Sequence, residues 1–188
     1  MLKKRLLMAC IALGLAASAS AGVRDHAVGY KQDIQFELGG PTNLLGVSYE
    51  RRIKDLEMLG VRVGLAWGFS SDDEVFGSYY DAKLNTVTVP VDVNVLLGRR
   101  AKHKFEGALG VNLGCYHERF KLQGGGIKVE GDQTNFGTFF YTNLGYRFCS
   151  KKGLLVRVGM TFNTDFIEGP ELFEKRNFAP YFGIGYAF

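Results

Sequence analysis

The stretch Pro180-Tyr-Phe-Gly-Ile-Gly-Tyr-Ala-Phe188 decides the fold, because bulky apolar side chains alternate in it with small ones. Successive side chains of an extended strand point to opposite faces, so Phe182, Ile184, Tyr186 and Phe188 share one face. The other face carries only glycine and alanine between them. A free amphipathic edge strand invites aggregation, whereas in a closed membrane barrel it pairs with the first strand and turns its bulky face to lipid. The alternative is the last strand of a soluble β-sheet.

The same period-two alternation recurs along the rest of the chain. It predicts strands over 33–39, 44–52, 60–70, 86–98, 105–116, 136–148 and 154–163, before the one at 180–188. Long loops are predicted at 71–85, 117–135 and 164–179, a tight turn at 40–43, and short connections at 53–59, 99–104 and 149–153. An even number of strands, each about ten residues long, fits a membrane barrel. The predicted fold is all-β, an eight-stranded antiparallel up-and-down transmembrane β-barrel.

The two faces of these strands differ in chemistry. Aromatic residues gather at both ends of the apolar face, as in the two girdles of a membrane barrel: Phe105, Tyr146, Phe148, Tyr186 and Phe188 near the short turns, and Trp67, Phe69, Phe140 and Phe162 near the long loops. The opposite face carries many glycines and eight charged residues, Glu37, Glu50, Arg52, Arg62, Asp92, Glu106, Arg147 and Arg157. Eight strands leave an interior that side chains fill, and buried charges must be paired. We therefore expect a plugged lumen crossed by acid–arginine pairs.

A soluble lipocalin-like carrier is the first alternative, because it also has eight alternating strands behind a signal peptide. Its apolar face would point inward, so the orientation of Val89, Val91 and Val93 distinguishes the two folds. Pro90 is a misfit in either case, because proline cannot donate to the ladder of a central strand. A bulge or a locally broken ladder is expected at this position.

The beginning of the chain is typical of an exported protein. A basic start, Met1-Leu-Lys-Lys-Arg5, precedes a short apolar run and the small residues Ala19-Ser-Ala21, so residues 1–21 are predicted to be a secretory signal peptide. Residues 22–188 then form the barrel domain, with 22–31 as a short leader. Cys10 raises the alternative of a lipoprotein. Loss of the three basic residues with the signal peptide lowers the net charge from +4 to +1, a balance that gives no indication of nucleic-acid binding.

The residues that could carry chemistry do not form a known catalytic or ligand-binding pattern. His26 lies in the leader, His103 in a basic turn, and His117 near the long-loop end, where Glu118 points to the opposite face. None has the serine and acid partners of a hydrolase, and Gly124-Gly-Gly126 lacks the residues of a phosphate loop. We therefore predict no catalytic, cofactor-binding or metal residues. Cys115 and Cys149 fall at opposite ends of their strands and are expected to stay unbridged.

The whole predicted mature chain resembles the small eight-stranded outer-membrane barrels, the porin-family group that includes the OmpA membrane domain and OmpX. The resemblance rests on the signal peptide, the hairpin regularity and the ending Gly183-Ile-Gly-Tyr-Ala-Phe188. It implies a non-enzymatic, monomeric protein of the Gram-negative outer membrane, with a structural or surface-interaction role through outward-facing loops. Its implied partners are outer-membrane lipids and lipopolysaccharide, and the barrel assembly machinery at the Phe188 end. A lipid-modifying barrel enzyme is the second alternative.

Overall fold

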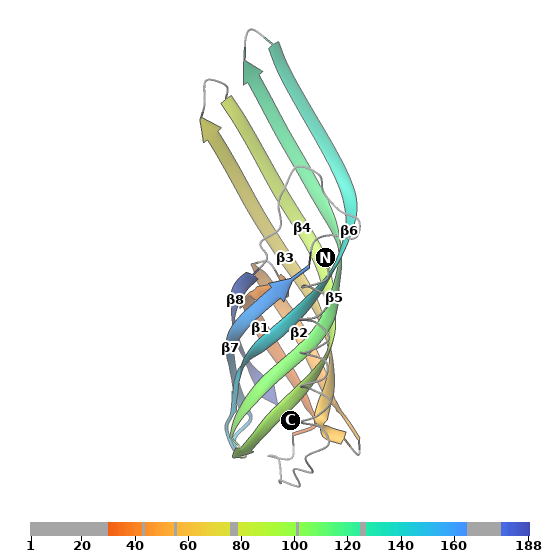
Figure 1. Cartoon of the computed structure of the whole chain (residues 1–188), viewed down its shortest axis with the longest axis vertical. Helices are drawn as coiled ribbons and strands as arrows, with labels where there is room; N and C mark the ends of the chain where they lie inside the picture. Colours follow the sequence, from red (N-terminus) through yellow and green to blue (C-terminus); the bar gives the residue numbers. More distant parts are fainter. Residues whose placement is uncertain are drawn as a thin grey trace, which may run out of the picture.

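The computed structural model describes residues 30–42, 44–54, 56–75, 79–100, 102–124, 127–164 and 178–188. These residues form eight antiparallel strands that pair in sequence order, and the last strand pairs with the first to close a barrel (Figure 1). The strands are β1 (Gln32–Gly39), β2 (Leu45–Ile53), β3 (Leu56–Val75), β4 (Tyr79–Arg100), β5 (His103–Gly124), β6 (Ile127–Cys149), β7 (Leu154–Asn163) and β8 (Phe178–Ala187). A short 3-10 helix, η1 (Gly40–Thr42), connects β1 to β2. The predicted all-β, eight-stranded, antiparallel up-and-down barrel is confirmed.

The decisive C-terminal stretch closes the barrel as expected. Gln35 of β1 lies opposite Gly185 of β8, and the pairing runs from Asp33–Ala187 to Gly39–Tyr181. The main-chain oxygen of Phe188 also accepts hydrogen bonds from the amides of Lys31 and Gln32, at 3.2 and 3.1 Å. Both ends of the described chain therefore lie at one end of the barrel, together with the turn residues Lys54 and Lys102 and the turn at 150–153. We call this the short-turn end, and the opposite one the hairpin end.

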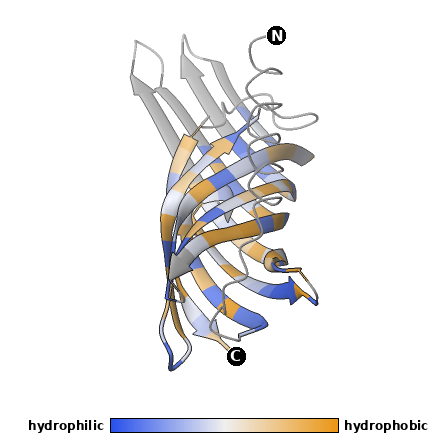
Figure 2. Ribbon diagram, turned by 60° about the horizontal axis from the view of Figure 1, so that its bottom comes forward, coloured by the Kyte–Doolittle hydropathy of each residue, from blue (hydrophilic) through white to orange (hydrophobic). Residues whose placement is uncertain are grey.

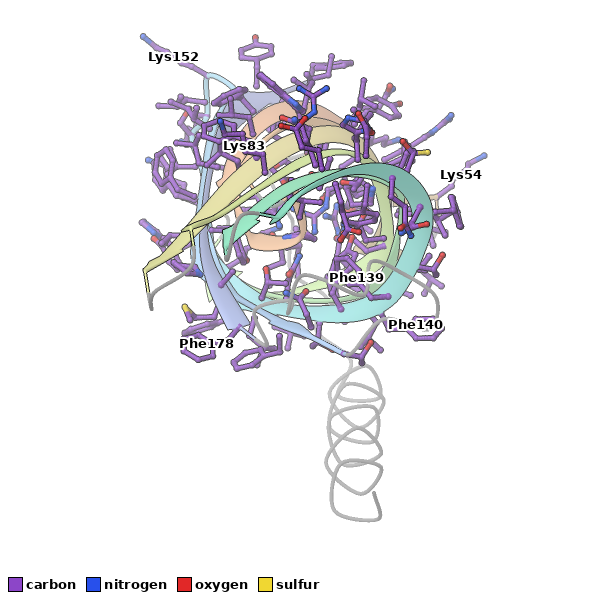
Figure 3. All side chains as sticks on the ribbon, turned by 90° about the horizontal axis from the view of Figure 1, so that it is seen from above. Lys54, Lys83, Phe139, Phe140, Lys152 and Phe178 are labelled. Carbon is purple, nitrogen blue, oxygen red and sulfur yellow. The ribbon has the colours of Figure 1, made fainter. Side chains whose placement is uncertain are left out.

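The apolar face of every strand points outward. Hydrophobic and hydrophilic residues alternate along the ribbons (Figure 2), and large side chains such as Leu65 and Phe105 are 62% and 70% exposed. Val89 and Val93 are exposed as well and Val91 is partly exposed, so these three valines of β4 do not point to the barrel axis, although Val95 at the short-turn end is 6% exposed. Phe139 lies inside the ring of strands, whereas its neighbour Phe140 lies outside (Figure 3). Period-two alternation therefore sorts the side chains as the sequence predicts.

Two of the predicted long loops are wrong. Where loops were expected at 71–85 and 117–135, β3 continues to Val75, β4 begins at Tyr79, and β5 and β6 meet at Gly124 and Ile127. Towards the hairpin end, the pairing of β3 with β2 stops at Trp67 and the pairing of β6 with β7 stops at Tyr141. Beyond these residues the strands β3 to β6 extend past the barrel as an open sheet (Figure 1). Asp132, Gln133 and Thr134 are consecutive and all exposed. With neither face buried, such a strand needs no alternation, and its sequence pattern is that of a loop.

The predicted connection at 53–59 is also too long. β3 begins at Leu56, and Ile53 pairs directly with Leu56 after a register shift beyond Arg52. The extra residues of β3 form an irregular stretch at the short-turn end, where the Arg52 guanidinium donates a 3.2 Å hydrogen bond to the carbonyl oxygen of Met58. A bulge of this kind breaks the two-residue period that marks a strand in the sequence.

Pro90 interrupts the ladder without shifting it. The pairing of β3 with β4 passes from Val63–Val91 to Ala66–Thr88 and leaves out the two pairs between them, while the register stays the same. The proline ring faces Gly64, where an added Cβ would lie 3.0 Å from Pro90 Cγ. The expected local break is confirmed, and the missing side chain at Gly64 makes room for the ring.

Several predictions fall on residues outside the described part of the chain. They concern the signal peptide at 1–21 with Cys10, most of the leader with His26, the two glycines 125–126, and the loop that precedes β8 from 165 to 177. Within the described residues, no helix has the length and apolar character needed to cross a bilayer.

Candidate functional site

The interior of the barrel contains a network of buried charges centred on Glu106 of β5. Its two carboxylate oxygens accept hydrogen bonds from Arg147 Nε at 2.6 Å, Arg157 Nε at 2.9 Å and Arg62 Nη1 at 3.1 Å. A further short contact joins it to Arg157 Nη2. The glutamate and the three arginines are each at most 3% exposed. Three guanidinium groups from β3, β6 and β7 thus meet on one carboxylate.

Towards the short-turn end, Arg147 links this centre to a second buried carboxylate. Its two terminal nitrogens donate to both oxygens of Glu50, at 2.7 and 2.6 Å, and one of them also donates to Asp33 at 3.3 Å. Arg52 completes this part through a close contact with Glu50 and a 2.6 Å hydrogen bond to Asn94. The bidentate geometry fixes the plane of the Arg147 guanidinium between β1 and β2.

Towards the hairpin end, Arg62 and Arg157 each hold another acid. Arg62 donates through Nε and Nη2 to one oxygen of Asp92, at 2.9 and 2.6 Å, and the Tyr141 hydroxyl donates to the same oxygen at 2.8 Å. Arg157 donates to Glu37 at 2.6 Å. Its guanidinium carbon also lies 5.1 Å from the centre of the Tyr181 ring, which is the geometry of a cation–π contact.

The predicted set of interior charges is confirmed, because all eight residues lie inside and form ion pairs with one another. Sequence reasoning did not name Asp33 as a fifth acid. The alternation places Gln35, Asn94 and Tyr141 on the inner face, but it did not identify them as neutral members of the network.

The tight turn after β1 lies across the barrel rather than on its rim. Gly39 and Gly40 have φ angles of 73° and 65°, a left-handed conformation that glycine adopts without strain. They direct η1 inward, where Gly40 and Pro41 are buried. Asn112 of β5 donates a 2.6 Å hydrogen bond to the Pro41 carbonyl oxygen. The sequence predicted the turn but gave no indication that it packs inside.

Glycines on the inner face make room for the tyrosines that fill it. A Cβ on Gly145 would lie 2.2 Å from the Tyr181 hydroxyl oxygen, and one on Gly159 would lie 2.7 Å from it. Gly110 similarly faces Tyr141, at 2.5 Å from its ring. By contrast, a Cβ on Gly183 would meet no atom nearer than 3.5 Å. The inner glycines therefore differ in the space around them, and those beside Tyr181 and Tyr141 are among the ones that the packing requires.

The candidate catalytic residues are not assembled into a site. His117 is partly exposed near the hairpin end, where Nδ1 lies 3.0 Å from Thr134 Oγ1 and Nε2 lies 3.4 Å from Asp132. Glu118 is buried and points to the opposite face, as predicted. His103 contacts the rings of Tyr146 and Phe148 at the short-turn end. Among the residues that the structure describes, no group of three His, Cys, Asp or Glu side chains has the arrangement of a metal site.

Comparisons with known proteins give matches of fold only. No protein-family model and no curated protein matches the chain. Among solved structures, Ail, the attachment invasion locus protein of Yersinia pestis, is 11% identical over 85% of this chain and 99% of that chain, with a TM-score of 0.46. CarO of Acinetobacter baumannii is 11% identical over 87% and 100% of the two chains, with a TM-score of 0.45. Neisserial surface protein A is 13% identical over 84% and 95%, with a TM-score of 0.41.

The chain's own residues define the class. It is a small, closed, eight-stranded antiparallel barrel with an apolar exterior and a charged, ion-paired interior. The resemblance to small barrels that the sequence predicts is confirmed at this level of fold.

Proposed function

We propose that this protein is a non-enzymatic, integral β-barrel of the bacterial outer membrane. The observation that carries the proposal is the exterior of the barrel, where large apolar side chains of all eight strands are exposed, from Ile34 on β1 to Ile184 on β8. Soluble monomers rarely expose contiguous apolar patches larger than a few hundred Å². Lipid covers such a surface, and the closed ladder leaves no unpaired strand edge in the hydrocarbon.

The interior supports a structural role with a closed lumen, in place of a carrier or an open channel. A lipocalin-like carrier needs large apolar side chains around its cavity, whereas arginines and carboxylates occupy the middle of this barrel. The Glu106 centre lies across the barrel axis. On its hairpin side lies η1, which the Asn112–Pro41 hydrogen bond attaches to β5. We infer that these two layers block the passage of ions and solutes.

The lipid-modifying enzyme is the weaker alternative. Such an enzyme needs a serine, a histidine and an acid that converge at the rim. The described partners of His117 are Thr134 and Asp132, and both pairs are exposed to solvent. These contacts are those of polar side chains on an exposed hairpin, and they do not place a nucleophile next to a base.

In the proposed orientation the short-turn end faces the periplasm and the hairpins of β3–β6 face outward. The open sheet then stands above the outer leaflet, where lipopolysaccharide surrounds its base. It forms the surface through which a structural or surface-interaction role is exerted. Phe188, at the periplasmic end, is the proposed contact with the barrel assembly machinery, and the barrel is proposed to act as a monomer.

The test of this proposal combines membrane fractionation with gel migration before and after heating. The full chain is expressed in a Gram-negative host and the inner and outer membranes are separated. We expect the protein in the outer-membrane fraction, with unheated and heated samples migrating differently because the folded barrel resists detergent. Recovery in the soluble periplasmic fraction would refute the membrane assignment. A steady single-channel conductance in planar bilayers would refute the closed lumen while leaving the membrane assignment intact.

A further inference from the structure

A groove on the outer face of the short-turn end has a strongly basic lining. It lies over β1, β2 and the start of β3 and has a volume of about 360 Å³. Lys31, Arg51, Arg52 and Lys54 contribute the charged part of its lining. Gln32, Ile53 and Val61 contribute the remainder, and no acidic residue lines it. Glu57, on the same hairpin, lines the neighbouring mouth of the lumen instead.

The strand pairing places these bases side by side. Arg51 of β2 lies between Gln32 of β1 and Val61 of β3, directly opposite each of them. Lys31 follows on the β1 side, because its carbonyl oxygen accepts the amide of Arg52 at 2.8 Å. Lys54 occupies the turn that follows Ile53 and points away from the barrel (Figure 3). The groove is therefore a built feature of the three adjacent strands.

Three of the four bases are available to a ligand. Arg52 is turned inward to Glu50 and Asn94. Lys31, Arg51 and Lys54 are exposed and form no ion pair with any described residue, and Asp55 lies outside the described part of the chain. Gln32 accepts a hydrogen bond from the Tyr49 hydroxyl at 2.6 Å, which leaves its amide nitrogen free to donate. Four groups that can donate to an anion thus surround one groove.

The position of the groove favours a ligand that is part of a membrane. Val61 and Ile53 are 43% and 40% exposed and continue the apolar exterior into the groove, while the lysines lie beyond the last apolar residues. A phospholipid matches this sequence of charged and apolar parts, because its anionic phosphodiester lies next to its acyl chains. Basic pockets at the polar end of membrane-spanning segments bind anionic lipid headgroups by this combination.

We propose that the groove binds the headgroup of an anionic glycerophospholipid in the leaflet that surrounds the short-turn end. Arg51 and Lys54 contact the phosphodiester, Gln32 and Lys31 complete the donor set, and an acyl chain lies along Val61. This inference rests on the membrane placement proposed above and adds a lipid class and a specific site to it. It predicts a preference for phosphatidylglycerol over phosphatidylcholine with the same acyl chains.

The test counts bound lipids by native mass spectrometry. The folded full chain, in detergent micelles, is mixed with equal amounts of phosphatidylglycerol and phosphatidylcholine, and the ratio of the two singly bound species is measured. In the Arg51→Gln/Lys54→Gln variant we expect this ratio to fall about thirtyfold, the effect of losing two basic side chains near an anionic surface. The matched control is Lys151→Gln/Lys152→Gln, which removes two charges from the turn between β6 and β7 at the same end; Lys152 points away from the barrel on a different side from Lys54 (Figure 3). Its ratio is expected to stay within about twofold of the original.

Three outcomes would overturn the inference. They are an absence of preference in the unmodified chain, an equal loss in both double variants, and displacement of phosphatidylglycerol by inorganic phosphate at a matched concentration, which would indicate a site for free anions. Gel migration before and after heating confirms that each variant is folded. If the first double variant does not fold, Arg51→Gln and Lys54→Gln are measured singly, each with an expected loss of about fivefold. An unmodified chain that reaches the outer membrane but shows no lipid preference refutes only this inference.

Discussion

Replacement of Glu106 by glutamine is expected to destabilise the barrel more than any other conservative change of a single interior side chain. Glutamine keeps the shape of glutamate but has one acceptor oxygen in place of two. If its oxygen takes the place of Oε2, it retains the contacts with Arg147 and Arg157 Nε, and its amide group then faces Arg62 Nη1 and Arg157 Nη2. Two guanidinium donors lose their acceptor at a position where water does not replace it.

The expected cost follows from these contacts. A hydrogen bond to a charged group contributes about 1.5–3 kcal/mol, and removal of one partner of a buried ion pair costs about 3–5 kcal/mol. Arg62 keeps Asp92 and Arg157 keeps Glu37, so the remaining acids limit the loss. We therefore expect Glu106→Gln to lower the free energy of unfolding by about 3–5 kcal/mol.

The assay is equilibrium urea unfolding of the folded protein in lipid vesicles, followed by the fluorescence of Trp67. It is the only tryptophan of the chain and is half exposed on the barrel exterior, so its emission reports the loss of the lipid environment. The control is Asp132→Asn, which removes a 3.4 Å ion pair with Arg119 in which both side chains are more than half exposed. Solvent-exposed pairs contribute about 0–1 kcal/mol, so the control should change stability little. A Glu106→Gln protein within about 1 kcal/mol of the original would refute the view that this carboxylate holds the interior together.

Three further predictions test the packing, the orientation and the cysteines. Gly145→Ala forces a Cβ against the Tyr181 hydroxyl and should cost about 1–3 kcal/mol in the same unfolding assay; Gly183→Ala, on the same inner face but with free space, should be nearly neutral. Val93→Arg places a charge on the exterior of β4, between Val61 and Leu109 of the neighbouring strands, and should cost up to about 4 kcal/mol in vesicles, whereas a soluble barrel would tolerate it at a 51% exposed position. Both cysteines of the described chain are free, so the denatured, unreduced protein without residues 1–21, which contain Cys10, should take up two maleimide labels, and an unlabelled product would reveal a disulfide.

The alternation of side chains predicts the barrel because both faces of a strand have a fixed environment there. One face of each strand meets lipid and the other meets the filled lumen. A shift of one residue in the register would exchange the outward-facing and the inward-facing side chains. The extension of β3–β6 lacks this constraint, because residues such as Asp132 and Gln133 are exposed on both faces. Its ladder depends on backbone hydrogen bonds between neighbouring strands, and these leave no mark on the choice of side chains.

The interior site is predictable in its membership but not in its pairing. Charges on the inner parity must meet inside a narrow barrel, which identifies the arginines and the acids. Which arginine meets which acid depends on the stagger between strands that are far apart in sequence, and 120 residues separate Glu37 from Arg157. The inward path of η1 is a further example, because Gly40-Pro-Thr-Asn43 predicts a turn without specifying its surroundings.

The ion-pair network also explains how the strands keep their stagger. A slip of one residue is excluded by the two faces, but a slip of two residues preserves the alternation and would go undetected by hydrophobicity alone. The network opposes such a two-residue slip, because each of the strands β1 to β7 contributes a member to it. On β8, the ring of Tyr181 contacts the Arg157 guanidinium. A two-residue slip of any strand would move a buried charge by about 7 Å along that strand and leave it without its partner. The apolar exterior therefore determines which face points outward, and the buried charges determine the register.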